Sequence, residues 1–179
     1  AHSFPTRRSS DLVLAKETRR IGELANSLSF FAKAQAADRS KVKLGELVDS
    51  ILIANSGIIS EKGLSIELDN QSREASLWAD RDKLARALTN ILNNAALFSP
   101  EGGTIRFRGR ELDGAVKVSV RDRGPGIEAE DLERIFEPFF SRRKGGSGLG
   151  LAIARDVVEL HGGEIGAQAR AGWGTEIWL

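Results

Sequence analysis

The first sustained pattern of apolar and polar positions runs from Val13 to about Asp38. Apolar residues in this stretch fall on the a and d positions of a heptad, with charged residues elsewhere: Leu14, Ile21, Leu24, Leu28 and Phe31. The pattern predicts a helix whose apolar seam packs against partner helices. An ordinary amphipathic helix is the alternative, because fewer than four heptads are present.

Helical spacing of the next apolar residues predicts a second helix, which ends at residues 61–63 where glycine provides the stop. Its apolar positions are Leu44, Leu47, Val48, Ile51, Ala54 and Ile58. Alternating apolar and polar residues then predict strands at 64–68 and 75–78. Asp80 is the expected N-cap of a third helix, which runs to about Phe98.

Residues 105–107 and 116–120 alternate on either side of Asp113-Gly114, which predicts a β-hairpin. The remaining pattern predicts a short helix, a longer helix after a glycine-rich loop, and two strands, at 128–135, 149–161, 164–169 and 175–179. Strands in hairpins interleaved with separate helices indicate an α+β fold. We expect a two-layer α/β sandwich in which helices cover one face of one mixed sheet.

Composition narrows the chemistry that the chain can perform. It has 26 Lys and Arg against 25 Asp and Glu, so net charge gives no argument for nucleic acid or an anionic membrane surface. It has no cysteine and two histidines, which excludes disulfides, thiolate metal sites and an imidazole cluster. No window approaches the roughly 18 consecutive apolar residues of a membrane span. We expect oxygen, amide and backbone chemistry, with no nucleic acid partner and no membrane contact by this fragment.

Residues 1–12 are set apart from the fold. The sequence from His2 to Leu12 matches the translation of a widely used sequencing-library adapter, and a match of this length is hard to obtain by chance. We expect that this segment is not native, that His2 has no role and that the natural chain extends upstream. A natural basic leader is the alternative.

Asn90 and Asn94 are the first candidate site residues. At positions i and i+4 of the predicted third helix they lie on one face, beside its apolar stripe. An amide oxygen is a neutral, hard ligand that suits a Mg²⁺ ion whose other ligands are waters and phosphates. Two solvent-facing asparagines would give the same pattern, so the pair alone does not identify a metal site.

Asp122 follows a predicted strand and precedes Gly124 and Gly126. A carboxylate in an apolar slot can accept a hydrogen bond from the exocyclic amine of adenine, and the glycines let the backbone approach a flat ligand. An Asp-x-Gly-x-Gly turn that merely closes a strand is common. This motif is therefore also weak by itself.

A glycine-rich loop, residues 145–150, leads directly into an apolar helix. Such a loop presents backbone N–H groups and the positive end of the helix dipole to a phosphate. It has neither a P-loop nor a Rossmann signature. The preceding residues 136–144 join phenylalanines to basic residues and fit a mobile lid whose cations reach phosphate. A buried phenylalanine pair followed by a solvated basic loop fits equally well.

In this order, these pieces resemble the N, G1, F and G2 boxes of the histidine kinase catalytic domain, in the ATPase superfamily shared with gyrase, Hsp90 and MutL. The matching segments are 90–95, 122–127, 136–140 and 146–151, and residues 172–175 resemble the closing G3 box. Each box alone is permissive, but five in order are highly specific. The resemblance implies a Bergerat-type ATP-binding fold over residues 41–179. It also implies that residues 13–40 are the second helix of a dimerisation and phosphoacceptor hairpin whose first helix is missing.

The resemblance implies that the ligands are ATP and Mg²⁺. Asn94 would hold Mg²⁺ with the ATP phosphates, Asn90 would support the phosphate side and Asp122 would bind adenine. Thr175 would complete the adenine pocket. The other positions that the resemblance assigns to nucleotide binding are Gly124, Gly126, Ile127, Phe139, Arg143, Lys144, Gly146, Gly148, Leu149, Gly150 and Leu151.

One position separates a kinase from a hydrolase. In the gyrase, Hsp90 and MutL branch, the residue four before the Mg-binding Asn is a Glu that activates water, whereas this chain has Asn90, which cannot take a proton. The resemblance therefore implies a protein histidine kinase that transfers the γ-phosphoryl group of ATP to a histidine, for relay to an Asp of a response regulator receiver domain. The alternatives are a non-catalytic nucleotide-binding module, a degenerate kinase and an ATPase of the same superfamily.

Two features depart from the family pattern. Many members carry Lys or Arg three residues after the Mg-binding Asn, but this chain has Leu97, so Arg142, Arg143 and Lys144 are expected to substitute. The His-Glu/Asp-x-x-x-Pro phosphoacceptor box is absent, so we expect the fragment alone to be incompetent, with His161 in a structural role. The full-length protein is expected to be a homodimer through its hairpin, with a cytoplasmic catalytic portion.

Overall fold

The computed structural model describes residues 18, 22, 37–68, 70–112, 114–143 and 146–179. The chain divides into two units, Ala1–Gln35 and Ala36–Leu179. Apart from Thr18 and Gly22, which are helical, the predicted heptad helix and the adapter-like segment lie outside the described residues. Within the described ranges, no helix has the length and apolar character needed to cross a bilayer.

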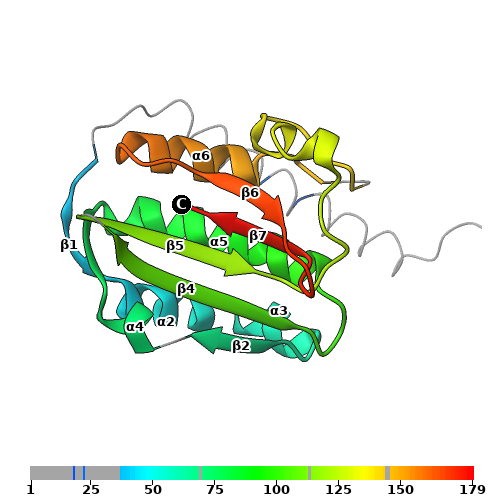
Figure 1. Cartoon of the computed structure of the whole chain (residues 1–179), viewed down its shortest axis with the longest axis horizontal. Helices are drawn as coiled ribbons and strands as arrows, with labels where there is room; N and C mark the ends of the chain where they lie inside the picture. Colours follow the sequence, from blue (N-terminus) through cyan, green and yellow to red (C-terminus); the bar gives the residue numbers. More distant parts are fainter. Residues whose placement is uncertain (1–17, 19–21, 23–36, 69, 113, 144–145) are drawn as a thin grey trace, which may run out of the picture. The chain divides into compact units, whose positions relative to one another are not determined.

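The second unit has two layers, a five-stranded sheet and a set of helices that cover one of its faces (Figure 1). The strand order is β2-β4-β5-β7-β6, and the strands are Ser65–Leu68 (β2), Thr104–Leu112 (β4), Ala115–Arg121 (β5), Gly166–Ala169 (β6) and Thr175–Trp178 (β7). β2 and β4 are parallel and the other neighbours are antiparallel, so the sheet is mixed. The predicted α+β two-layer sandwich is confirmed.

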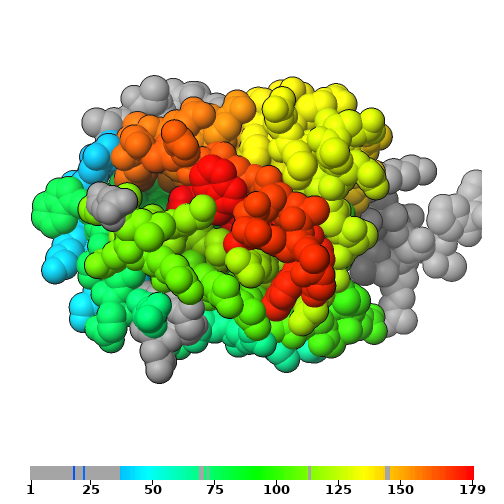
Figure 2. All heavy atoms as spheres, in the orientation of Figure 1, coloured from blue at the N-terminus to red at the C-terminus, as the bar shows by residue number. Residues whose placement is uncertain are grey.

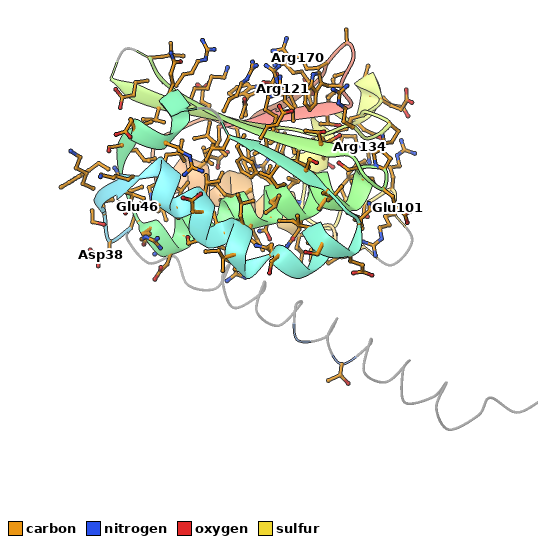
Figure 3. All side chains as sticks on the ribbon, turned by 90° about the horizontal axis from the view of Figure 1, so that it is seen from below. Asp38, Glu46, Glu101, Arg121, Arg134 and Arg170 are labelled. Atoms are coloured by element: carbon orange, nitrogen blue, oxygen red, sulfur yellow. The ribbon has the colours of Figure 1, made fainter. Side chains whose placement is uncertain are left out.

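The helical layer is seen beneath the sheet in Figure 3. Its helices are Leu44–Ala54 (α2), Ser56–Glu61 (α3), Asn70–Glu74 (α4), Arg81–Phe98 (α5) and Gly150–Leu160 (α6). Alternation on β4 turns Ile105 and Phe107 toward this layer, where both are almost fully buried against the apolar stripes of α5 and α6. Burial of a side chain of this size is worth about 1.5–3 kcal/mol, so the core is the main stabilising element of the domain.

A second, two-stranded sheet was not expected from the sequence. Ser40–Lys43 (β1) pairs antiparallel with Ser76–Ala79 (β3), so the predicted strand at 75–78 exists but lies outside the five-stranded sheet. β1 escaped prediction because only Val42 among its four residues is buried. A strand this short and polar gives too little alternation to be recognised.

The predicted second helix is divided at Asn55 into α2 and α3. The Asn55 backbone leaves the helical region (φ −108°, ψ 15°), and its Nδ2 donates to the Ile51 carbonyl at 2.7 Å. Asparagine competes in this way with the helical backbone bonds. The helix predicted near 128–135 is two 3-10 turns, Ala129–Asp131 and Arg134–Phe136, and the short helix α4 was missed.

Both ends of α5 are held by side chains. Asp80 is the N-cap, as predicted, since the Lys83 backbone N–H donates to its Oδ1 at 3.1 Å. At the other end, Lys62 Nζ donates to the carbonyls of Ala96, Leu97 and Ser99 at 2.7, 3.0 and 2.5 Å. A cation there satisfies the terminal carbonyls and complements the helix dipole, so α5 is fixed at both ends.

Candidate functional site

Asn90 and Asn94 lie on α5 beside its buried stripe, and both are half-buried. α6 begins against Asn90, because a Cβ placed on Gly150 would lie 3.7 Å from both Cβ and Cγ of Asn90. Asn90 Nδ2 is buried and has no hydrogen-bond partner in the described part of the chain. A buried amide donor without a partner is costly, and its position beside a helix start suits the oxygen of an anionic ligand.

The N-terminus of α6 is open to such a ligand. No side chain caps the helix, and the hydroxyl of Ser147 makes only a long contact of 3.4 Å with the Leu149 N–H. The N–H groups of the following first turn, beginning at Gly150, therefore have no helical acceptor. Unpaired N–H groups at a helix N-terminus favour phosphate, as the glycine-rich sequence predicted.

The phenylalanine segment and the glycine-rich loop are joined at Phe139 and Gly148. Phe139 N–H donates to the Gly148 carbonyl at 2.9 Å, and a Cβ on Gly148 would come within 2.4 Å of the Phe139 carbonyl carbon. Both residues have positive φ, 67° and 66°. Only glycine allows the backbone at residue 148 to approach this closely. Of the phenylalanines in the segment, Phe136 is buried and Phe139 is 67% exposed.

Asp122 lies immediately after β5 and is only 6% exposed. Its Oδ1 accepts hydrogen bonds from the N–H groups of Gly124 and Thr175 at 2.8 and 3.2 Å. Burial raises the pKa of Asp122, an effect that these two hydrogen bonds only partly offset. No described residue donates to Oδ2, so that oxygen can accept from a ligand amine.

The segments around Gly124 and Gly174 pack as one unit around Asp122. Asp122 N–H donates to the Thr175 carbonyl at 3.0 Å, and Gly174 N–H donates to the Asp122 carbonyl at 2.9 Å. A Cβ on Gly174 would lie 2.3 Å from the Gly124 carbonyl oxygen. A side chain at residue 174 does not fit there, so the two backbone segments lie directly against each other. Gly126 has φ 87° and Ile127 is half-buried nearby in the chain.

α5 contacts both the region around Asn90 and the region around Asp122. Asn90, Asn94 and Phe98 are spaced by four residues and share one face of the helix. Asn90 contacts the start of α6, and the Phe98 carbonyl lies 2.9 Å from where a Cβ of Gly124 would stand. The sequence motifs are therefore brought together along one helix face, rising about 12 Å over eight residues.

Arg142 is not free to act as a phosphate ligand. Its Nε and Nη2 donate to the two carboxylate oxygens of Asp131 at 2.8 and 2.9 Å, and Nη2 also reaches Glu130 at 3.0 Å. The hydrogen bonds from Arg142 lower the pKa of Asp131. Of the expected lid cations, Arg143 is exposed with no described side-chain partner, and Lys144 lies outside the described residues. Asp131 was missed because nothing in the sequence marks a pair eleven residues apart.

His161 has both ring nitrogens engaged. The Asp80 N–H donates to Nε2 at 2.9 Å, so Nδ1 carries the proton and donates to the Val157 carbonyl at 2.7 Å. A ring held in this way has no lone pair available for attack on a phosphate. Asp80 also accepts from the Asp38 N–H at 3.2 Å, which ties residue 38 to the start of α5.

Protein side chains alone do not complete a metal site. No cluster of three or more His, Cys, Asp or Glu with metal-binding geometry is found among the described residues. The donors present are the amides of Asn90 and Asn94, which fit a hard cation that takes its other ligands from phosphate and water. The residues thus fit a magnesium–nucleotide complex better than a free metal ion.

Comparison with known proteins agrees with this geometry. The family described as "Histidine kinase-, DNA gyrase B-, and HSP90-like ATPase" matches residues 79–179. This chain belongs to that family. Its relatives are sensor histidine kinases: ZraS of Klebsiella oxytoca is 35% identical over 165 residues, and WalK of Bacillus subtilis is 33% identical over 178 residues.

Solved structures point to the same subgroup. The catalytic domain of histidine kinase ThkA, free of nucleotide, has a TM-score of 0.71 and 30% identity, covering 79% of this chain and 93% of that one. Full-length ShkA in complex with AMPPNP has a TM-score of 0.81 and 31% identity, covering 98% and 39%. The described domain is therefore a histidine kinase ATPase catalytic domain, which confirms the family resemblance.

The chain corresponds to part of its curated relatives. The match to ZraS covers 92% of this chain but 36% of the relative, and the match to WalK covers 93% and 29%. The family membership thus concerns the catalytic region, and the activity of a whole sensor kinase is a separate question.

Proposed function

We propose that this domain binds Mg-ATP and presents the γ-phosphoryl group to a histidine supplied by another element. The observation that carries the proposal is Asn90. It stands four residues before Asn94, against the start of α6, with a buried Nδ2 that lacks a protein partner. An amide there can hold a phosphate oxygen but cannot take a proton from water, which favours transfer to a histidine over hydrolysis.

The adenine would lie against Asp122. Its Oδ2 would accept from the exocyclic amine while Oδ1 keeps the N–H groups of Gly124 and Thr175. Because both bonds to Oδ1 come from backbone, the carboxylate orientation is set before the base arrives. Gly126 and Ile127 would flank the ring.

The phosphates would lie between Asn90 and the glycine-rich start of α6. N–H groups from Gly150 onward, together with Leu149 and Leu151 as apolar walls, would hold the oxygens without a basic side chain. Gly146 and Gly148 would let the loop approach, and Arg143 would close over it. Asn94 Oδ1 would hold Mg²⁺, which supplies charge neutralisation on the transferred phosphoryl group.

The acceptor histidine would come from the first helix of a dimerisation hairpin. This sequence has no His-Glu/Asp-x-x-x-Pro motif, and His161 is occupied by structural hydrogen bonds, so this chain alone is expected not to phosphorylate itself. The full-length protein would form a homodimer through this hairpin. The phosphoryl group would then pass from the histidine to an Asp in the receiver domain of a response regulator. The relatives named sensor histidine kinases support this assignment, and the catalytic portion would be cytoplasmic.

The test uses the 179-residue chain, ATP labelled on the γ-phosphate and a separately supplied histidine-containing hairpin. We expect Mg-dependent labelling of the hairpin, and no labelling of a hairpin in which histidine is replaced by glutamine. Rapid release of labelled phosphate would instead identify a hydrolase and refute the role of Asn90. Binding of ATP without either reaction would identify a non-catalytic nucleotide module.

A further inference from the structure

The face of the five-stranded sheet opposite the helices is open and rich in cations. Strand alternation places five basic residues on this side: Arg106, Arg108 and Arg110 on β4, and Lys117 and Arg121 on β5. Arg170 follows β6, and Figure 3 shows Arg121 and Arg170 directed away from the helical layer. In Figure 2, which views this face, side chains of β4, β5 and β7 form the surface.

At one end of this face each arginine is paired with a carboxylate. Glu67 accepts from Arg106 at 2.5 Å, and Glu176 accepts from Arg121 at 2.8 Å and from Arg170 at 2.5 Å. Glu176 is almost fully buried, and these hydrogen bonds lower its pKa although burial opposes them. At this end every arginine is therefore engaged by a carboxylate, although three arginines share two glutamates.

The other end does not neutralise its charge. Arg110 and Lys117 are directly opposite each other in the β4–β5 register, and Arg108 lies two residues before Arg110 on the same side. Neither Arg108 nor Arg110 makes an ion pair within the described part of the chain, and Lys117 lies over the Trp178 ring at 4.7 Å. Like charges directly opposite on a sheet are destabilising. We call Arg108, Arg110 and Lys117 the cationic cluster.

Apolar surface borders the cationic cluster on both sides. Leu112 follows on the same side of β4 and is 52% exposed. The Trp178 ring lies flat over Gly166, where an added Cβ would come within 2.3 Å of it. The surface thus combines surplus positive charge with two apolar contacts.

We propose that the cationic cluster docks an acidic, extended segment of a partner protein. Alternate residues on a strand are about 6.7 Å apart, so Arg108, Arg110 and Leu112 match a segment with acid, acid and apolar side chains at alternate positions. Guanidinium groups bind carboxylates through paired hydrogen bonds. The basic side chains without a carboxylate partner on this face of the described strands are these three, a footprint too small for a lipid surface or a duplex but sufficient for a short peptide.

The proposal is independent of nucleotide binding and is tested with the 179-residue chain. The probe is a fluorescein-labelled peptide of Glu-Ser-Glu-Ser-Leu-Ser repeats, and its control replaces Glu by Gln. The variant is Arg108→Glu with Arg110→Glu. The matched control is Lys41→Glu with Arg81→Glu, two exposed cations outside this face that give the same change in net charge.

We expect the acidic peptide to bind at low salt, with affinity lowered by about tenfold or more in the Arg108/Arg110 variant only. The same variant should unfold at a higher temperature, because Arg110→Glu turns a repulsion with Lys117 into an attraction. An equal loss of peptide affinity in the Arg108/Arg110 variant and in the Lys41/Arg81 control would show only an effect of net charge and would overturn the proposal. Stronger, Arg108/Arg110-dependent binding of oligo(dT) or of phosphatidylserine-containing vesicles would also overturn it.

Discussion

Arg142 holds Asp131 by two hydrogen bonds, Nε to Oδ2 at 2.8 Å and Nη2 to Oδ1 at 2.9 Å. The Asp131 side chain is only 6% exposed, whereas Arg142 comes from the basic segment expected to cover the phosphates. The contact fastens that segment to the 3-10 turn Ala129–Asp131. The basic segment is thus held at Arg142 by a carboxylate, and Arg143 lies beyond this attachment.

Replacing Asp131 with Asn should loosen this attachment. The charge-assisted pair is lost, so trypsin should cut at Arg142 or Arg143 several-fold faster than in the unchanged protein. Limited proteolysis followed by mass spectrometry measures this rate. Glu130→Gln is the matched control, because Glu130 also contacts Arg142 but is 76% exposed. Equal acceleration by both changes would contradict the role of Asp131.

Asp122→Asn should weaken nucleotide binding. Hydrogen bonds to charged groups are worth about 1.5–3 kcal/mol, so we expect ATP affinity to fall by about 10- to 100-fold, measured by calorimetry. The asparagine Oδ1 can still accept from Gly124 and Thr175, which keeps the local backbone in place. Full ATP affinity in this variant would exclude Asp122 as the adenine ligand.

The same substitution should stabilise the nucleotide-free domain at neutral pH. Burial raises the pKa of Asp122 in the folded state, so the folded domain binds a proton more readily than the unfolded chain. The resulting stabilisation is present below the unfolded-state pKa and is lost as pH rises through the folded-state pKa. Asp122→Asn should therefore raise the unfolding midpoint at pH 7 but not below pH ~3.9, the ordinary pKa of an Asp. Urea unfolding at both pH values checks this.

Asn94→Ala should remove the magnesium-dependent part of ATP affinity. ATP affinity in the presence of Mg²⁺ should fall by about tenfold or more, because the substitution removes the amide proposed to bind the cation. ATP titrations in the presence of Mg²⁺ and in the presence of EDTA separate the magnesium-dependent part of the affinity from the remainder. Asn93→Ala is the control, since Asn93 is the exposed neighbour on the same helix. An unchanged magnesium dependence in Asn94→Ala would rule out the assigned ligand.

Lys62→Met should destabilise the domain, although Lys62 is not among the residues proposed to bind the nucleotide. Its ammonium group satisfies three carbonyls at the end of α5, and charged hydrogen bonds contribute about 1.5–3 kcal/mol. Chemical denaturation should show a loss of that order, compared with almost none for Lys41→Met, whose side chain is exposed. A similar stability in both variants would show that water replaces Lys62 as the cap.

The sequence predicted the parts of this molecule that depend on neighbours along the chain. Helical and alternating patterns reflect which side of an element is buried, and Asp80 as a cap reflects a bond to Lys83 three residues away. The nucleotide-binding motifs could be recognised in the sequence because each consists of residues that lie close together along the chain. Their arrangement along α5 is seen only in the folded chain.

The parts that were missed depend on contacts between distant residues. Lys62 reaches the end of α5 from 34 to 37 residues away, and β1 pairs with β3 although α2, α3, β2 and α4 lie between them in the sequence. Asp131 is paired with Arg142, eleven residues further along the chain. No local pattern marks such pairs, because their energy arises only when the chain is folded.

Asp122 and Thr175 are 53 residues apart in sequence yet adjacent in the site. β7, which begins with Thr175, is placed between β5 and β6 in the sheet, so during synthesis β5 has an unpaired edge until β7 emerges. Contacts of such long range form late because closing the intervening loop costs entropy. The proposed base-binding part of the site is therefore completed only when β7 joins the sheet, because Thr175, the first residue of that strand, donates to Asp122.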